Sequence, residues 1–197
     1  MRPSAMPTST EPETTDPTPR PRARVRAWWA ALPAALALAL AIAPGAVSAR
    51  VGGRPPPFQL PAAVGGPTSN PFRMADHLEH NPVVILFWAT WCVPCRQELP
   101  FYQSLYERYR ERGLRMVAVS MDDASTITRA GPAARRLGVT FDVVTDLDTR
   151  LTTQLNPRRS APFSVWVGRD GRITWEHEGF APSEQSTIEQ GIAQLMQ

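Results

Sequence analysis

From Phe87 to Cys95 the chain reads FWATWCVPC, and Cys92 and Cys95 are its only two cysteines. The stretch continues an apolar run that begins at Val83 and shows no alternation, which predicts a strand covered on both faces. A disulfide within C-x-x-C closes so short a loop that it removes little chain entropy from the unfolded state. Because such a bond would stabilise nothing distant, we interpret the pair as a reversible redox centre.

The rest of the sequence indicates an α/β fold. A helix is expected from Cys92 to about Arg112, kinked at Pro100 and ended by Gly113. A parallel β-α-β arrangement, an antiparallel hairpin and a closing helix together predict a mixed central sheet flanked by helices. The other expected elements are short strands at 58–60 and 72–78 (the latter a strand or a helical turn), strands at 114–120, 141–144, 163–167 and 173–177, and helices at 125–137, 149–155 and 183–196.

The chemistry of the cysteine pair follows from its place at the start of the long helix. Unpaired N–H groups and the helix dipole stabilise a thiolate there, so the pKa of Cys92 is expected to be lowered and its sulfur to attack. Cys95, one turn further in, should be less exposed and should resolve the mixed disulfide. Between them, Val93 and Pro94 add no histidine or lysine, so we expect a moderate pKa shift and a reducing potential.

A zinc site is the main structural alternative for C-x-x-C, and it needs four ligands. His77, His80 and His177 are the only histidines, and there is no second cysteine pair. The ligand pattern of a metal site is therefore missing. We expect the three histidines to lie on solvated faces, and the sequence predicts neither a metal nor another cofactor.

The first quarter of the chain is interpreted as a leader. Residues 1–26 are rich in Pro, Thr, Ser and Arg without an apolar period, which predicts a disordered basic n-region. Residues 27–49 carry no charge and predict either a signal peptide cleaved after Ala49, which the small residues there favour, or an uncleaved membrane anchor. Residues 50–57 are interpreted as a Gly/Pro tether and 58–197 as one domain. Both interpretations place the domain outside the cytoplasm, in an oxidising compartment.

Charge excludes one broad class of function. The chain has 21 basic and 18 acidic residues; its first 49 positions hold five arginines and three acids, which leaves 16 basic and 15 acidic residues. So small an excess is no footprint of a nucleic-acid-binding surface. The chain contains arginine and no lysine, which we interpret as a composition bias.

Residues 87–100, FWATWCVPCRQELP, resemble the active-site stretch of bacterial cell-envelope thioredoxin-like proteins of the TlpA, ResA and CcmG type, in the AhpC/TSA-like thioredoxin superfamily. The resemblance runs from about Phe58 to the C-terminus and includes three further stretches, at 117–122, 138–141 and 165–171. It implies a thioredoxin fold with an N-terminal β extension and a β-α segment inserted around residues 124–145.

The resemblance also implies roles for residues beyond the cysteines. It implies a cis bond between Ala161 and Pro162, which would leave the backbone of Ala161 free to pair with an extended partner chain. Glu98 matches an acid that the family keeps near the two sulfurs. We expect it to be partly buried, to have a raised pKa and to help move the proton when the second cysteine attacks. Trp91 is expected to form one side of the site. Together with Pro94, Ala161 and Pro162 it is expected to contact substrate.

By the same resemblance the chain is expected to be an exported, monomeric thiol–disulfide oxidoreductase. It would reduce disulfides of envelope proteins in cytochrome c maturation or in assembly of an oxidase copper site, and a membrane electron donor would recharge its dithiol. Two alternatives stay open: an oxidase that forms disulfides, and a binding or chaperone module without turnover. A peroxidase is disfavoured, because Ala89 stands three residues before Cys92, where that chemistry needs a threonine or serine.

Overall fold

The computed structural model describes residues 51–197. The n-region expected at 1–26 and the signal peptide or anchor expected at 27–49 lie outside these residues. Within the described part, no helix is both long enough and apolar enough to cross a membrane.

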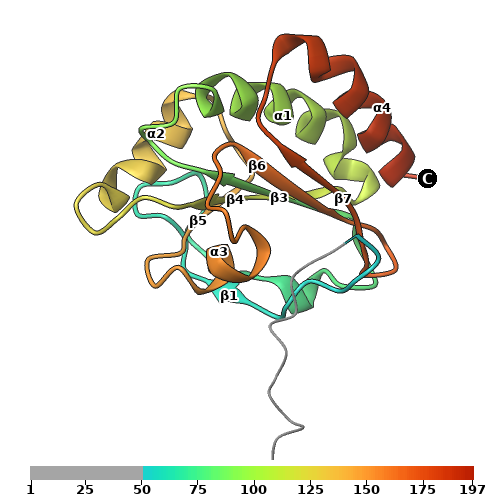
Figure 1. The fold of residues 1–197 in the computed structure, drawn as a ribbon, viewed down its shortest axis with the longest axis horizontal. Helices are drawn as coiled ribbons and strands as arrows, with labels where there is room; N and C mark the ends of the chain where they lie inside the picture. Colours follow the sequence, from blue (N-terminus) through green and yellow to red (C-terminus); the bar gives the residue numbers. More distant parts are fainter. Residues whose placement is uncertain (1–50) are drawn as a thin grey trace, which may run out of the picture. The chain divides into compact units, whose positions relative to one another are not determined.

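A five-stranded mixed sheet forms the centre of the domain (Figure 1). Its strands, in spatial order, are β5 (Asp142–Thr145), β4 (Arg115–Ser120), β3 (Val83–Trp88), β6 (Phe163–Val167) and β7 (Ile173–Glu178). β3 and β4 are parallel, as are β4 and β5, whereas β6 runs antiparallel to β3 and β7 antiparallel to β6. This is the mixed sheet that the sequence predicts, hairpin included.

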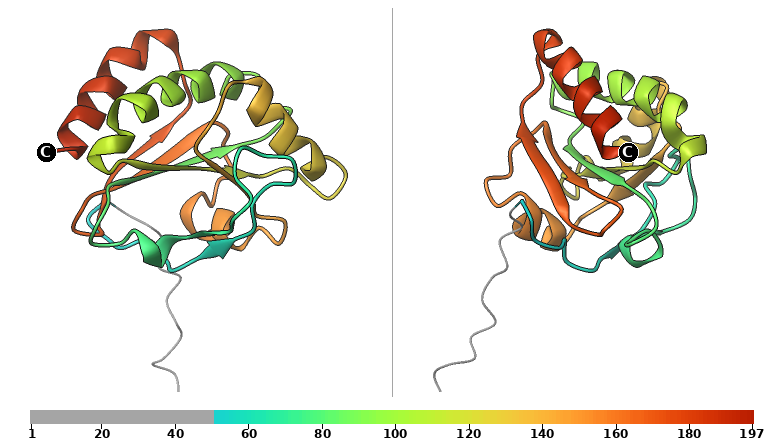
Figure 2. Two further views of the ribbon diagram at one scale, coloured as in Figure 1. Left: turned by 180° about the vertical axis from the view of Figure 1, so that it is seen from behind. Right: turned by 90° about the vertical axis from the view of Figure 1, so that its right-hand side faces the viewer.

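Helices cover both faces of this sheet (Figures 1 and 2). On one face lie α1 (Cys95–Tyr109), α2 (Ala130–Arg136) and α4 (Gln185–Leu195). On the other lie α3 (Arg150–Leu155) and a small antiparallel sheet of β1 (Gln59–Leu60) and β2 (Phe72–Arg73). Short 3-10 turns occupy Met74–Asp76, Arg110–Arg112, Ile127–Arg129 and Pro182–Glu184.

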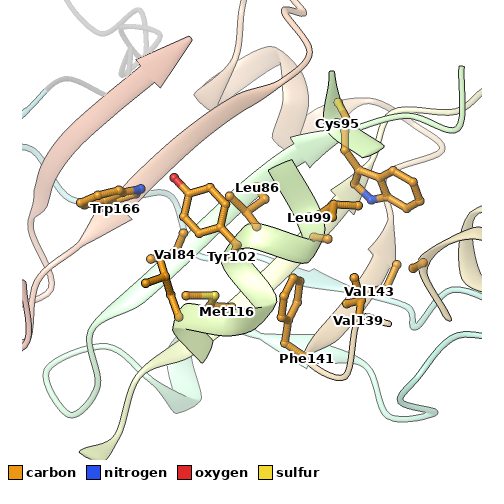
Figure 3. Packing of buried hydrophobic residues seen from close by; sticks show 14 of the residues in the cluster. Val84, Leu86, Cys95, Leu99, Tyr102, Met116, Val139, Phe141, Val143 and Trp166 are labelled. Atoms are coloured by element: carbon orange, nitrogen blue, oxygen red, sulfur yellow. The ribbon is translucent and has the colours of Figure 1, made fainter. Parts of the chain in front are cut away.

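The two layers explain why β3 is apolar at every position. Successive side chains of a strand point to opposite faces, so a strand covered on both faces has no polar side. Three alternate residues belong to the cluster under α1 and the other three to the cluster on the α3 side: Val84, Leu86 and Trp88 in the first case, and Val83, Ile85 and Phe87 in the second. Figure 3 shows the first cluster, in which Leu86 of the sheet lies beside Leu99 of α1.

Some helix boundaries differ from the expectations. α1 begins at Cys95 and not at Cys92, because Cys92 lies in the turn between β3 and the helix. The helix continues through Pro100, and a 3-10 turn carries it to Arg112. Gly113 ends it, as predicted, with a φ of 98° that a residue without a side chain adopts readily. The helix expected at 125–137 is shorter, a 3-10 turn followed by α2.

The segment predicted as a tether is hydrogen-bonded to the domain. The N–H of Gly52 donates to the carbonyl of Ile173 at 2.7 Å, and the N–H of Ile173 donates to the carbonyl of Gly53 at 2.8 Å. The Arg172 side chain also donates to the Gly52 carbonyl at 2.8 Å. The folded part therefore begins ahead of Phe58, with residues 52–53 held against the start of β7.

The N-terminal extension covers the opposite edge of the sheet. The N–H of Ala63 donates to the carbonyl of Val143 at 2.8 Å, and the N–H of Thr145 donates to the carbonyl of Pro61 at 3.1 Å. These bonds satisfy groups of the edge strand β5 that would otherwise be available to another chain. The β extension and the inserted α2–β5 segment, both implied by the resemblance, thus lie next to each other.

Candidate active site

Cys92 and Cys95 form a disulfide, with the sulfurs 2.08 Å and the Cα atoms 5.4 Å apart. The turn that holds them follows β3, and the N–H of Cys92 donates to the carbonyl of Ala89 at 3.0 Å. Cys95 is fully buried and Cys92 is 3% exposed. Cys95 is the less accessible of the two, as expected, but the sulfur expected to attack is also covered while it is bonded to its partner.

The first N–H of α1 points at the attacking sulfur. The N–H of Cys95 lies 3.2 Å from the Sγ of Cys92. Pro94 stands before it at the N-cap position, where no side chain caps the helix. The first N–H groups of a helix have no partner inside it, and one of them here faces sulfur. The expected stabilisation of a Cys92 thiolate therefore has a specific donor, although Cys92 itself lies three residues before α1.

A buried carboxylate holds the loop just ahead of the cysteines. Asp122 accepts hydrogen bonds from the N–H of Thr90, at 3.0 Å, and from the Thr90 hydroxyl. It accepts another from the hydroxyl of Ser120 at 2.8 Å. Because β3 and β4 are parallel, the residues that follow them meet at one edge of the sheet. This pair is not among the predictions from the sequence, although an aspartate two residues after the end of a buried strand is a signal for it.

Glu98 lies one turn beyond Cys95 and is only 1% exposed. Residues at i and i+3 of a helix share a face, with their Cβ atoms about 5–6 Å apart. Within residues 51–197 neither oxygen of its carboxyl group has a hydrogen-bond partner. Burial raises the pKa of Glu98 to about 8. Glu98 is therefore buried more deeply than the partial burial expected, and its pKa is shifted in the expected direction.

Tyr102 continues this line of polar groups into the core. It lies at i+4 from Glu98 and is fully buried, and burial, with the charge of Glu98 adding to it, raises the pKa of its hydroxyl. In Figure 3 the Tyr102 hydroxyl points towards Trp166. The buried hydroxyl of Ser164 is a polar neighbour of the Tyr102 hydroxyl. The sequence offers only the i, i+4 spacing of Glu98 and Tyr102 as a sign of this cluster.

The Ala161–Pro162 bond is cis, as the resemblance implies. β6 begins at the next residue, Phe163, which pairs with Phe87 near the end of β3. Because the two strands are antiparallel, the cis bond lies at the edge where β3 leads into the cysteine turn. The carbonyl of Pro162 accepts from the N–H of Gly179 at 2.8 Å, whereas neither backbone group of Ala161 makes a hydrogen bond within residues 51–197.

Three exposed residues surround the buried disulfide. Trp91 is 60% and Val93 63% exposed, and Pro94 is exposed as well. Trp91 also lines a hollow of about 570 Å³ next to α2. Trp88, by contrast, is a core residue of β3. The residues expected to contact substrate therefore lie around the disulfide at one edge of the sheet.

The histidines do not all lie on solvated faces. His80 is exposed, but His77 and His177 are half-buried. The His77 ring lies 4.9 Å from the ring of Phe72, and burial lowers its pKa. His177 lies on β7, 3.5 Å from the Glu184 carboxylate. Aromatic neighbours on β2 and β7 cover the two rings, a contact that single positions in the sequence do not reveal. Within residues 51–197, no three His, Cys, Asp or Glu side chains gather into a metal-binding group.

Comparisons with known proteins give the site a family context. The family model described as AhpC/TSA matches residues 51–176, more than half of the chain. A thiol-disulfide oxidoreductase ResA of Oceanobacillus iheyensis is 41% identical over 78 residues, which are 40% of this chain and 40% of that protein. The ResA of Geobacillus kaustophilus is 30% identical over 123 residues, 62% of this chain and 66% of that protein. The chain thus spans about two fifths to two thirds of these relatives.

Solved structures show the same fold. The thiol:disulfide interchange protein DsbE of Chlorobium tepidum is 27% identical, with a TM-score of 0.67 over 76% of this chain and 100% of that one. A secreted Mycobacterium tuberculosis disulfide oxidoreductase, 18% identical, has a TM-score of 0.57 over 70% of this chain and 95% of that one, and it shows the fold alone. The matched family model and the shared fold lead to one conclusion: the chain belongs to the AhpC/TSA family and has a thioredoxin-like fold.

Proposed function

We propose that the chain is a thiol–disulfide oxidoreductase that reduces disulfides of other proteins through Cys92 and Cys95. The observation that carries the proposal is the C-x-x-C disulfide between β3 and α1, with the cis Ala161–Pro162 bond at the same edge of the sheet. The names of the relatives, thiol-disulfide oxidoreductase and thiol:disulfide interchange protein, support the same class of reaction.

The reaction begins from the dithiol form. The Cys92 thiolate attacks one sulfur of a client disulfide, forms a mixed disulfide and releases the other client sulfur, which takes up a proton. The Cys95 thiolate then attacks Sγ of Cys92, closes the disulfide seen here and releases the second client thiol. Two electrons and two protons pass to the client. The free backbone groups of Ala161 are suited to hold the client as an added strand.

Glu98 is proposed to take the proton that Cys95 must lose before it attacks. Burial raises the pKa of Glu98 to about 8, and a carboxylate with a raised pKa is a stronger base than an ordinary one, which suits it to take up a thiol proton. The substitution Glu98→Gln keeps the shape and removes the ionisation. The second step should then slow, and its pH profile should lose one ionisation. Gln97→Ala, at the exposed neighbouring position, is the matched control and should leave both unchanged.

The direction of electron flow is proposed to be reductive. Val93 and Pro94 bring no charged donor to the sulfurs, and the Cys95 N–H is the donor that faces the Cys92 sulfur. A moderately stabilised thiolate corresponds to a potential near that of thioredoxin, about −270 mV, rather than the about −120 mV of a strong oxidant. Equilibration of the protein with dithiothreitol or glutathione buffers measures this value. A result near −120 mV would favour the disulfide-forming oxidase instead.

The clients are proposed to be proteins outside the cytoplasm. The charge-free stretch 27–49 supports export, because it is typical of a signal peptide or an anchor. The likeness to ResA and DsbE makes cysteines of cytochrome c or of an oxidase copper site the first clients to test, with a membrane electron donor restoring the dithiol. Identification of proteins held as mixed disulfides after export tests this, since cytoplasmic clients alone would exclude it.

A further inference from the structure

A hollow of about 570 Å³ lies between the cysteine turn and the inserted segment. Its lining comes from the end of β3 and the cysteine turn, from the start of α1, and from the 3-10 turn and α2 of the insert: Trp88, Thr90, Trp91, Arg96, Arg129, Ala133, Arg136 and Leu137. Trp91 directly precedes Cys92 and Arg96 directly follows Cys95, so residues on both sides of the cysteine pair in the sequence line the hollow.

Three arginines give this hollow a strong positive charge. Arg96, Arg129 and Arg136 are all exposed, and no carboxylate is among the lining residues. None of the three forms an ion pair within residues 51–197. Since the part of the chain without its first 49 residues is almost neutral, such a group of unpaired guanidinium ions is a local feature of this surface.

The nearby carboxylate of Asp122 does not neutralise these charges by pairing with them. It is 3% exposed and accepts hydrogen bonds from Thr90 and Ser120. The held loop in turn orients one of the arginines, because a guanidinium N–H of Arg96 donates to the carbonyl of Thr90 at 3.3 Å. A guanidinium has five N–H donors, so Arg96 keeps most of them for a ligand.

We propose that this hollow, here called the arginine hollow, binds acidic side chains of the client polypeptide next to the cysteine that Cys92 attacks. The proposal rests on the proposed function. Guanidinium groups pair with carboxylates in bidentate, charge-assisted hydrogen bonds, and the exposed Trp91 adds apolar contact. An extended chain advances about 3.3 Å per residue, so the acidic residues should lie within a few positions of the client cysteine.

A protein client explains the position of these charges better than a membrane surface does. Two of the arginines come from the insert, Arg129 from its 3-10 turn and Arg136 from α2, while Arg96 directly follows Cys95. Positive charges around a hollow that the cysteine turn helps to line attract the acidic groups of a polypeptide that brings a disulfide to this turn. The insert thus contributes to the choice of client, while the cysteine turn carries out the exchange.

The test compares two peptides that share one intramolecular disulfide and differ only in flanking residues, Asp and Glu in one and Asn and Gln in the other. The full chain in its dithiol form should reduce the acidic peptide with a kcat/KM about tenfold higher at low salt, because a few exposed ion pairs of modest strength add up to a factor of this order. Added salt should shrink the ratio, because it screens exposed charges.

Two variants test whether the arginine hollow causes the preference for the acidic peptide. The double substitution Arg129→Gln with Arg136→Gln should bring the ratio of the two kcat/KM values close to one. Arg135→Gln is the matched control, because Arg135 is exposed on the same helix but does not line the arginine hollow, and it should keep the preference. A ratio that stays near tenfold in the double variant, or a ratio of one in the wild type, overturns the proposal.

A third substrate separates this proposal from the proposed function. Hydroxyethyl disulfide is small and uncharged, so the double arginine variant and Arg135→Gln should both reduce it at the wild-type rate. If wild type fails to reduce it and both peptides, the proposed function is wrong; if it reduces all three with no acidic preference, only the arginine hollow is wrong. A lipid site is the other possible outcome. If wild type shows no preference between the two peptides but binds vesicles of anionic lipid, and the double variant does not bind them, the proposal is overturned in favour of a lipid site.

Discussion

The carboxylate of Asp122 accepts hydrogen bonds from both the backbone N–H and the hydroxyl of Thr90, two residues before Cys92. One buried side chain thereby ties the end of β4 to the loop that follows β3. The same loop carries Trp91 and the disulfide, and its Thr90 carbonyl accepts from Arg96. The position of the redox centre relative to the sheet therefore depends on a contact between residues 32 positions apart in the sequence.

Asp122→Ala should destabilise the domain. The change leaves the Thr90 N–H and the Ser120 hydroxyl without their partner, and a buried polar group left unsatisfied costs about 1–3 kcal/mol. Chemical denaturation of the disulfide form measures the loss. Asp123→Ala is the control, because within residues 51–197 the side chain of the exposed Asp123 bonds only to the neighbouring Ser125 and Thr126. Equal losses in both variants would contradict the prediction.

Glu98 should make the disulfide form less stable as pH rises. Its folded pKa of about 8 exceeds the ordinary 4.5, so between these values the folded state holds a proton that the unfolded state has released. Stability is then full below about pH 4.5 and falls as pH rises towards 8. Glu98→Gln should remove this slope and gain a few kcal/mol at pH 8 relative to wild type. Denaturation curves between pH 4.5 and 9 measure it; parallel pH profiles would contradict the assignment.

Gly131→Ala should destabilise α2 although alanine is the better helix former. A Cβ at this position would lie 2.3 Å from the carbonyl oxygen of Val64 and 2.5 Å from the N–H nitrogen of Gly66. Backbone atoms cannot move aside as a side chain tip does, and overpacking of this kind costs about 1–3 kcal/mol. Thermal or chemical unfolding measures the loss. Arg135→Ala, exposed on the same helix, should stay within about 0.5 kcal/mol of wild type.

Cys95→Ser should accumulate a mixed disulfide between Cys92 and a client, because the resolving sulfur is gone. Cys92→Ser should accumulate none, since the fully buried Cys95 is not accessible to a client. Non-reducing gel electrophoresis followed by mass spectrometry of the cross-linked bands measures both. Absence of any covalent partner with Cys95→Ser would support a binding or chaperone module without turnover.

Much of the fold could be predicted because local sequence patterns, such as apolar runs and turn residues, indicate its strands and turns. The apolar run at 83–88 has no polar face, and it is the central strand β3 covered on both sides. The Asp170-Gly171 pair predicts the hairpin, and Gly171 has the positive φ of 73° that such a turn uses. Helix starts are less predictable: the helix expected from Cys92 begins three residues later.

The sequence alone determined the chemistry of this protein, which rests on two cysteines spaced as C-x-x-C after a buried strand. The resemblance added the cis bond between Ala161 and Pro162 and the acid Glu98. The tertiary structure decided how that chemistry is surrounded. The burial of Glu98 depends on which face of α1 meets the sheet. The hydrogen bonds between Thr90 and Asp122 depend on the parallel pairing of β3 and β4, and the arginine hollow depends on how the insert packs against the cysteine turn. Such contacts join residues far apart in the chain, and the local periodicity of a sequence does not say which distant residues will meet.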